Sequence, residues 1–441
     1  MSRWKFLAVR VGIPLVLGAI PLWYQSYYVM PLASLPAHTL PSPNGYDTFQ
    51  EAMDLVTQPE SERQYPQGTA SLSLIERQDI QAANMEYFQG AASLPLTERQ
   101  KTLAANQRCI AKTREALTQE YLVPRRAFFH PEDYDSHLKL LRLASQTYSD
   151  SGDLPKAMQC ALDTIALGVN MPRGGGLDAW DAGAGYEATG QFAAWRLANR
   201  VDAQTARQAL ARLEPLEEQR WPLPENLREN LWRSNPYSPL NDFKEGPFYI
   251  WGKLASASET LSEQEDILPK SVRAFWYRTK AVYGGPKALM QDIEAVVKRA
   301  QEHFDQPWQP GRSELPLDFL VADYPYYGYS SREAGNYSQR AQAALLRTYL
   351  ALRAYRLERG SYPQSLEQLV SAGYLKSVPK DPFSPTRSPL RYAPDGKLWS
   401  VGPNATDDNG QVPGKDQLGR DNYQTGDMLP PVDTTSKRTD S

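Results

Sequence analysis

The sequence predicts an α+β protein with an N-terminal transmembrane anchor, an irregular all-α domain built from helical hairpins, and a C-terminal domain with a long helix and a small antiparallel sheet. Basic residues followed by an apolar run open the chain, helical periodicity fills its middle, and a helix followed by two strand-prone runs ends it. The predicted segments are an anchor at 1–30, a proline-rich linker at 31–45, a helical domain at 46–330, the C-terminal domain at 331–428 and a disordered tail at 429–441.

The N-terminal segment has the order of residues that is typical of a signal anchor. Arg3 and Lys5 precede a nearly continuous apolar run at residues 6–23, with Arg10 inside it. Basic residues ahead of an apolar segment stay in the cytoplasm, so the rest of the chain is expected outside it. An uncleaved anchor is favoured because no small-x-small site directly follows the run, although a cleaved signal peptide also fits.

Composition narrows the function classes. The 441 residues carry a formal charge of −3 and show no basic stripe, which argues against nucleic-acid binding. The four histidines are scattered without metal-ligand spacing, and no Gly-x-Ser-x-Gly elbow is present. We therefore predict a protein that is not an enzyme.

The middle of the chain is predicted to be helical. Ser151-Gly152-Asp153-Leu154 indicates the turn of a helical hairpin, but no sustained 34-residue period exists, so an irregular domain is preferred over a repeat array. The predicted helices cover residues 46–56, 74–90, 96–121, 137–148, 155–170, 186–199, 203–216 and 287–304.

Glycines and cysteines of this domain each allow two interpretations. A glycine-rich stretch after residue 173 lacks the preceding strand and the Gly-Lys-Ser/Thr of a nucleotide loop, so it predicts a loop and then close helix packing on small residues. Cys109 and Cys160 both fall in predicted helices, either as two buried thiols or as a disulfide. The glycines concerned are Gly174, Gly175, Gly176, Gly183, Gly185 and Gly190.

The C-terminal quarter shows a specific order of elements. An apolar stripe through Ala341, Leu345 and Leu352 predicts a helix that ends at Gly360. A short second helix is expected at residues 366–372, followed by two strands at 390–393 and 397–401 around an Asp-Gly turn.

This order resembles the globular domain of the major pseudopilin (type G) of type II secretion, as found in membrane-anchored bacterial envelope proteins. The resemblance implies a link to a secretion or envelope assembly and a single-pass location in the bacterial inner (cytoplasmic) membrane, with the bulk extracytoplasmic or periplasmic. Roughly three hundred residues separate the N-terminus from this domain, and no pilin-type N-terminal motif is present, so polymerisation into a pilus is not expected. The residues that carry it are Gly360-Ser361-Tyr362-Pro363, Leu366-Glu367-Gln368-Leu369, Pro379-Lys380-Asp381-Pro382 and Leu398-Trp399-Ser400-Val401-Gly402-Pro403-Asn404.

A loop at residues 402–410 is the candidate metal site. It supplies carboxylate, amide and backbone oxygens, which are the ligands that calcium prefers. The resemblance implies calcium bound by the carbonyl of Val401 with Asn404, Asp407, Asp408 and Asp427, although Asn404 stands where the family usually has Asp. The alternative is a solvated turn without an ion.

Two functions are compatible with these features. We expect a membrane-anchored extracytoplasmic structural or interaction protein with an unknown protein partner, attached to the membrane through its N-terminal helix. Aromatic clusters at residues 275–277 and 324–329, beside Asp323 and Arg332, instead allow an envelope protein that binds or processes polysaccharide. An aromatic seam packed between the two domains is the preferred interpretation of the second cluster.

Overall fold

The computed structural model describes residues 39–57, 93–125, 127, 134–234, 291, 293–310, 329–411 and 426–430. The predicted anchor, the predicted helix at 74–90 and the aromatic residues 275–277 and 324–328 lie outside these ranges. The strands are β1 (Arg391–Tyr392) and β2 (Leu398–Trp399), and the helices are α3 (Gly45–Met53), α5 (Leu96–Ala105), α6 (Gln107–Ala116), α7 (Asp135–Asp150), α8 (Leu154–Asn170), α9 (Gly176–Ala198), α10 (Ala203–Glu218), α11 (Leu223–Ser234), α14 (Tyr329–Arg359) and α15 (Glu367–Ser371).

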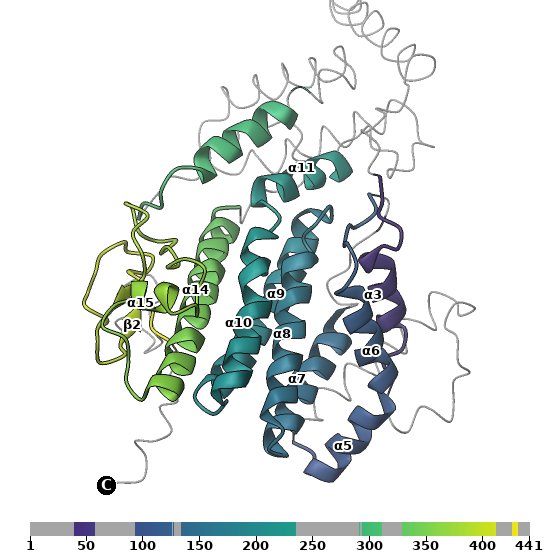
Figure 1. Cartoon of the computed structure of the whole chain (residues 1–441). Coiled ribbons are helices and arrows are strands. Elements are labelled where there is room, and N and C mark those ends of the chain that lie inside the picture. The colour runs from purple at the N-terminus through teal and green to yellow at the C-terminus, as the bar shows by residue number, and fades with distance from the viewer. Residues whose placement is uncertain are drawn as a thin grey trace, which may run out of the picture. The chain divides into compact units, whose positions relative to one another are not determined.

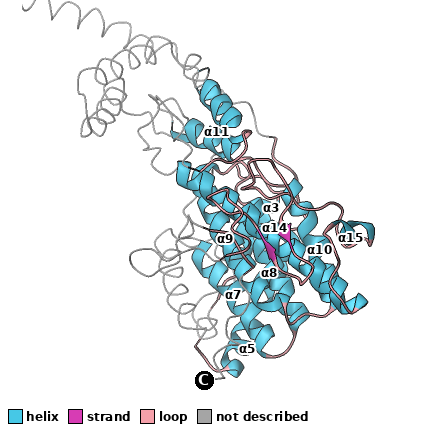
Figure 2. Ribbon diagram, turned by 90° about the vertical axis from the view of Figure 1, so that its left-hand side faces the viewer, coloured by secondary structure: helices cyan, strands magenta, loops and turns pink. Residues whose placement is uncertain are grey.

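The predicted α+β class is wrong, because the described part of the chain is mostly helical with one two-residue strand pair (Figure 2). The two strand-prone runs pair over only two residues each, Arg391 with Trp399 and Tyr392 with Leu398. Pro389 and Pro394 flank the first run, and proline removes the N–H that a longer ladder needs. Turns and the isolated bridges from Lys380 to Pro389 and from Ser400 to Met428 take the place of a sheet.

No helix among the described residues is long and apolar enough to cross a bilayer. This statement does not extend to residues 1–38, where the anchor is predicted. The membrane segment therefore stays a prediction.

The chain divides into two compact units. The smaller one contains most of α11 and the helical residues 293–303, in which Arg228 pairs with Glu294 at 3.1 Å. The larger one contains residues 40–226, 304–313 and 330–441, so the C-terminal helix α14 belongs to the same unit as helices α3 to α10.

Helices α7 and α8 meet at the predicted hairpin turn, where Gly152 adopts a positive φ of 84° and Asp153 caps α8 by accepting the Lys156 N–H at 3.1 Å. Helices α8 and α9 then pack against each other on small residues, as the glycine pattern predicts. A Cβ placed on Gly168 would lie 2.6 Å from the carbonyl oxygen of Gly183, and one on Gly190 would lie 2.7 Å from that of Ala161. Such distances leave no room for any side chain larger than hydrogen.

The main hydrophobic core runs through α8, α9 and α10 into α14 and the segment that follows it. Leu345 and Leu352 of α14 cluster with Leu210 and Leu213 of α10, and these helices lie side by side (Figure 1). Polar contacts reinforce this packing, because Arg340 of α14 donates to Glu217 of α10 at 2.7 Å.

A second core lies where α3 meets α6, α7 and α9. Asn44 fixes α3 there, because its side-chain oxygen accepts the N–H groups of Tyr46 and Leu122, both at 3.1 Å. His137 is buried beside this core, between the Thr113 hydroxyl at 2.8 Å and the Tyr186 hydroxyl at 3.1 Å. Burial lowers the pKa of His137 from 6.5 to about 3, so the imidazole is neutral at physiological pH.

His137 is expected to make the protein acid-sensitive. The unfolded chain protonates this histidine below pH 6.5, whereas the folded chain does so only near pH 3. The contribution of the neutral His137 to the free energy of unfolding is therefore fully present above pH 6.5. It falls by about 1.4 kcal/mol per pH unit as the pH drops from 6.5 toward 3. Urea unfolding followed by circular dichroism between pH 4 and 7 measures this slope. His137→Gln should flatten it, and His303→Gln should not. Equal slopes in wild type and His137→Gln would contradict the assignment.

Both cysteines are buried as free thiols. Cys109 and Cys160 belong to the same apolar cluster between α5, α6, α7 and α8, and burial raises the pKa of each thiol to about 12. The structure therefore has two buried thiols and no disulfide between these cysteines.

Candidate functional site

The structure gathers part of the predicted calcium-binding set. Asp427 is buried and accepts the N–H groups of Asp408 at 3.2 Å and Gly410 at 2.5 Å, so the loop folds around its carboxylate. The Asn404 amide donates to Asp408 at 2.9 Å. Asn404, Asp408 and Asp427 therefore lie together, and their oxygens are of the type that suits calcium.

Asp407 is held by the hairpin instead. One of its oxygens accepts from Arg391 Nε and the other from Trp399 Nε1, each at 2.9 Å. Arg391 and Trp399 are register partners in β1 and β2, so the hairpin presents both donors to the same carboxylate. The N–H of Val401, another predicted ligand, donates to Asp381 at 2.8 Å.

The electrostatics of the loop are consistent with a cation but do not define one. Burial raises the pKa of Asp427 above its ordinary 3.8, opposed by the N–H groups of Asp408 and Gly410 and assisted by the charges of Asp407 and Asp408. Within the described residues, no group of three or more acidic, histidine or cysteine side chains is placed to hold a metal ion. Calcium stays a prediction.

The described aromatic residues near the start of α14 form a packed cluster. Trp308, Tyr337 and Phe383 have ring centroids between 5.0 and 6.0 Å apart, and Trp308 Nε1 donates to the Pro403 carbonyl at 2.8 Å. Arg332, named in the polysaccharide alternative, pairs with Asp181 of α9 at 2.5 Å. These rings act in packing, and the predicted cluster at 324–328 lies outside the described residues.

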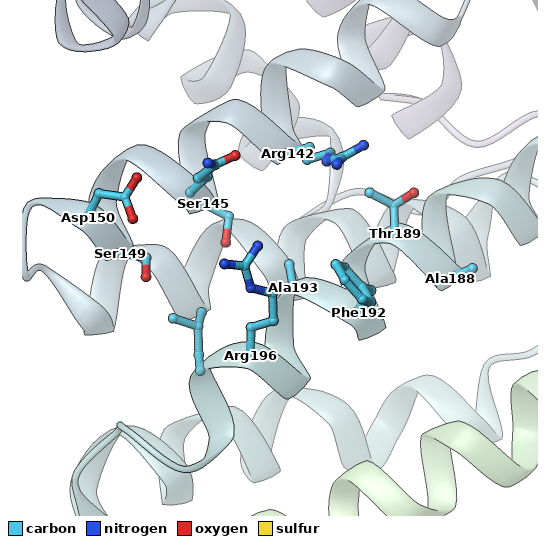
Figure 3. A pocket seen from close by; sticks show the side chains of 11 residues that line it. Arg142, Ser145, Ser149, Asp150, Ala188, Thr189, Phe192, Ala193 and Arg196 are labelled. Atoms are coloured by element: carbon cyan, nitrogen blue, oxygen red, sulfur yellow. The ribbon is translucent and has the colours of Figure 1, made fainter. Parts of the chain in front are cut away.

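A groove of ≈ 380 Å³ between α7 and α9 is a candidate site within the described residues (Figure 3). This volume falls in the range of about 300–1,000 Å³ that is typical of ligand pockets. Phe192 of α9 lines it with 57% of its surface exposed, an unusual state for a phenylalanine in a packed helix. Apolar contributions also come from Ala188, Ala193 and Leu197.

The charges around the groove are predominantly positive. Arg142 of α7 and Arg196 of α9 line it, and neither makes an ion pair or hydrogen bond with any described residue. Figure 3 shows the guanidinium of Arg196 extending from α9 toward α7. The one carboxylate in the lining, Asp150, is paired with Arg99 at 2.8 Å.

Hydrogen bonds fix both walls of the groove. The Ser145 hydroxyl donates to the Ala157 carbonyl at 3.0 Å, which ties α7 to α8. At the end of α7, Arg200 donates to the Ser149 hydroxyl at 2.7 Å and to its carbonyl at 3.3 Å. Hydrogen bonds therefore hold the helices around the groove together, and Arg200, two residues after α9, places a third cation near it.

Sequence reasoning did not find this groove. Ala188, Phe192 and Arg196 recur at intervals of four and so share one face of α9. A single apolar residue among polar neighbours on a helix is common, so this pattern alone does not predict a groove. The predicted helix at 186–199 contains all three positions although α9 begins at Gly176, but periodicity does not show which face other helices leave uncovered.

The comparisons with known proteins add no further assignment. The resemblance to the major pseudopilin domain thus depends on the residues quoted above alone. No family model, curated protein or solved structure matches this chain.

Proposed function

We propose that this protein is a membrane-anchored, extracytoplasmic interaction protein, not an enzyme, and that the groove between α7 and α9 is its binding surface. The observation that carries the proposal is the exposed Phe192 between the two unpaired arginines Arg142 and Arg196. Aromatic side chains and arginine are enriched at protein interfaces, where the ring supplies buried apolar area and the guanidinium supplies directed hydrogen bonds.

Attachment to the membrane is proposed from the N-terminal sequence, and the link to a secretion or envelope assembly from the pseudopilin resemblance. Arg3, Lys5 and Arg10 favour an N-terminus in the cytoplasm. Fractionation and protease treatment of spheroplasts test the location. Release of the protein by carbonate washing, or protection from external protease, would contradict it.

Cross-linking at the groove tests the interaction itself. A photo-reactive amino acid in place of Phe192, introduced into the full chain in its native cells, is expected to give a discrete adduct with one protein. The same amino acid in place of Leu357, which is 45% exposed on α14, is the matched control. Equal labelling at both positions, or no adduct at position 192, would refute the groove as the binding surface.

We also propose that the loop at residues 402–410 binds calcium through Asn404, Asp408 and Asp427. Support comes from their proximity and from the burial of Asp427, whose charge a cation would stabilise. We propose Asp407 as a support of the loop and not as a ligand, because its carboxylate already pairs with Arg391.

Calcium is expected to stabilise the folded protein by mass action, by about 2.7 kcal/mol at a concentration one hundred times the dissociation constant. Calorimetry of the full chain in detergent, first with chelator and then with millimolar calcium, measures the rise in melting temperature. Asp407→Asn/Asp408→Asn should abolish that rise, whereas Asp395→Asn, an exposed residue outside the loop, should retain it. An unchanged melting temperature in the unmutated protein would leave the loop as a solvated turn.

A further inference from the structure

We propose that the groove between α7 and α9 binds an acidic segment of a partner protein, in which carboxylate side chains flank an apolar residue. This inference rests on the proposed function, since it specifies the chemistry of the occupant of the same surface. Its basis is the combination of unbalanced positive charge, an exposed ring and concave shape in one place.

The charge of the groove favours an anionic occupant. Arg142 and Arg196 project from opposite walls without a described partner, and Arg200 adds a cation where α7 ends. The only opposing charge in the lining, Asp150, is neutralised by Arg99. Guanidinium groups bind carboxylates through parallel N–H donors, so each arginine can hold one acidic side chain.

The apolar surface requires more than a small anion. Phe192 lies between the charged positions, together with Ala188 and Ala193. A phosphate or a free carboxylate would satisfy one arginine and leave the ring in water. An apolar side chain between two acidic residues would cover the ring while both charges are paired, which is the arrangement of anchors that helix-lined grooves recognise.

Two polar side chains are available for the backbone of such a segment. Gln146 of α7 and Thr189 of α9 line the groove and make no hydrogen bond to another described residue. An amide and a hydroxyl each donate and accept, so they match the peptide N–H and C=O groups. A membrane surface offers no such pairing, and its contact favours a protruding ring over one set in a concave wall.

Selection from a displayed library of random 12-residue peptides, applied to the full chain in detergent, tests the inference. Enriched peptides are expected to carry Asp or Glu on both sides of an aliphatic or aromatic residue. Synthetic copies should bind about ten- to a hundredfold more weakly to Arg142→Glu/Arg196→Glu and to Phe192→Ser. Arg108→Glu, the same charge reversal at an exposed residue of α6 outside the groove, should leave binding unchanged.

Each other outcome overturns the inference in a distinguishable way. Enrichment of basic or neutral peptides, or equal loss of binding in Arg108→Glu, would refute the acidic occupant. Binding of anionic phospholipid vesicles or of an oligogalacturonate that is lost in Arg142→Glu/Arg196→Glu, without any selected peptide, would assign the groove to a lipid surface or a polysaccharide. A protein adduct at position 192 together with non-acidic peptides would refute this inference while the proposed function stands.

Discussion

Replacing Glu187 with alanine is expected to destabilise the protein by about 3–5 kcal/mol, because it leaves a buried arginine without its main counter-charge. The Glu187 side chain is 2% exposed and receives both terminal nitrogens of Arg220, one of them at 2.8 Å. Gln191 donates to the same carboxylate at 2.8 Å. All of these atoms lie where α9 and the end of α10 meet α14.

The loss of stability arises at Arg220, which keeps its buried charge but loses its main partner. Its burial alone lowers the pKa of the guanidinium, but Glu187 and Glu217 together outweigh that effect and hold the pKa above its usual value. Without Glu187, only Glu217 remains as a partner, and Arg340 shares it. Less of the desolvation of Arg220 is then compensated.

Urea unfolding followed by circular dichroism measures the loss. Glu358→Ala is the matched control, because Glu358 forms a bidentate pair with Arg207 at the surface, where such pairs contribute about 0–1 kcal/mol. Glu187→Leu/Arg220→Met should recover part of the loss, since an apolar pair replaces the buried charges. Equal unfolding midpoints for Glu187→Ala and Glu358→Ala would show that the network contributes nothing beyond surface pairing.

Replacing Gly168 or Gly190 with alanine is expected to destabilise the protein by about 1–3 kcal/mol for each change, as overpacking of a filled core does. A Cβ on Gly168 would lie 2.5 Å from the backbone nitrogen of Glu187, and one on Gly190 would lie 2.7 Å from that of Ile165. Backbone atoms cannot move aside as a flexible side chain can. The two helices must therefore separate.

Gly185 provides an internal control for that experiment. Gly185 lies in α9, as Gly190 does, and an added Cβ there would meet nothing within 4 Å. Gly185→Ala should therefore stabilise the protein by about 0.5–1 kcal/mol through helix propensity alone. Thermal unfolding of the three variants measures the difference, and a loss of stability in Gly185→Ala as large as in Gly190→Ala would contradict helix packing as the cause.

Local signals in the sequence predicted most of the described helices, missed α11 and predicted the sheet poorly. The stripe through Ala341, Leu345 and Leu352 falls inside α14, and Gly360 follows the last residue of that helix with a positive φ of 80°. The predicted helix at 96–121 divides at Asn106, whose side chain accepts the Thr57 N–H at 2.9 Å. The periodicity of apolar residues cannot predict a hydrogen-bond partner 49 residues away.

The two C-terminal strands are shorter than predicted for a related reason. A strand-prone run needs neighbours on both sides to become a sheet, and the run beyond Tyr392 meets Pro394, while Met428 supplies only one bridge to Ser400. Of the predicted loop residues, Asn404 contacts Asp408, and Asp408 contacts Asp427. Asp407 does not join them, because the register of β1 and β2 places two donors at its carboxylate.

The groove could not be predicted from the sequence for a third reason. Both walls depend on which faces of α7 and α9 other helices leave uncovered, and tertiary packing sets this choice. Phe192 reads as an ordinary apolar residue in a helix that also carries Trp195 and Leu197, both buried. The sequence contains the residues of the site, but their exposure is a property of the packed helices.

The shared core of α10 and α14 also determines when folding can finish during synthesis. Arg340 follows its partner Glu217 by 123 residues, and at about 5–20 residues per second a ribosome needs roughly 6–25 s to make that stretch. Throughout this delay Leu210 and Leu213 have no α14 to cover them, although their own helix is complete. A nascent chain of this protein therefore carries an exposed apolar face that only its last quarter can close, and chaperones that bind such faces have a defined interval in which to act.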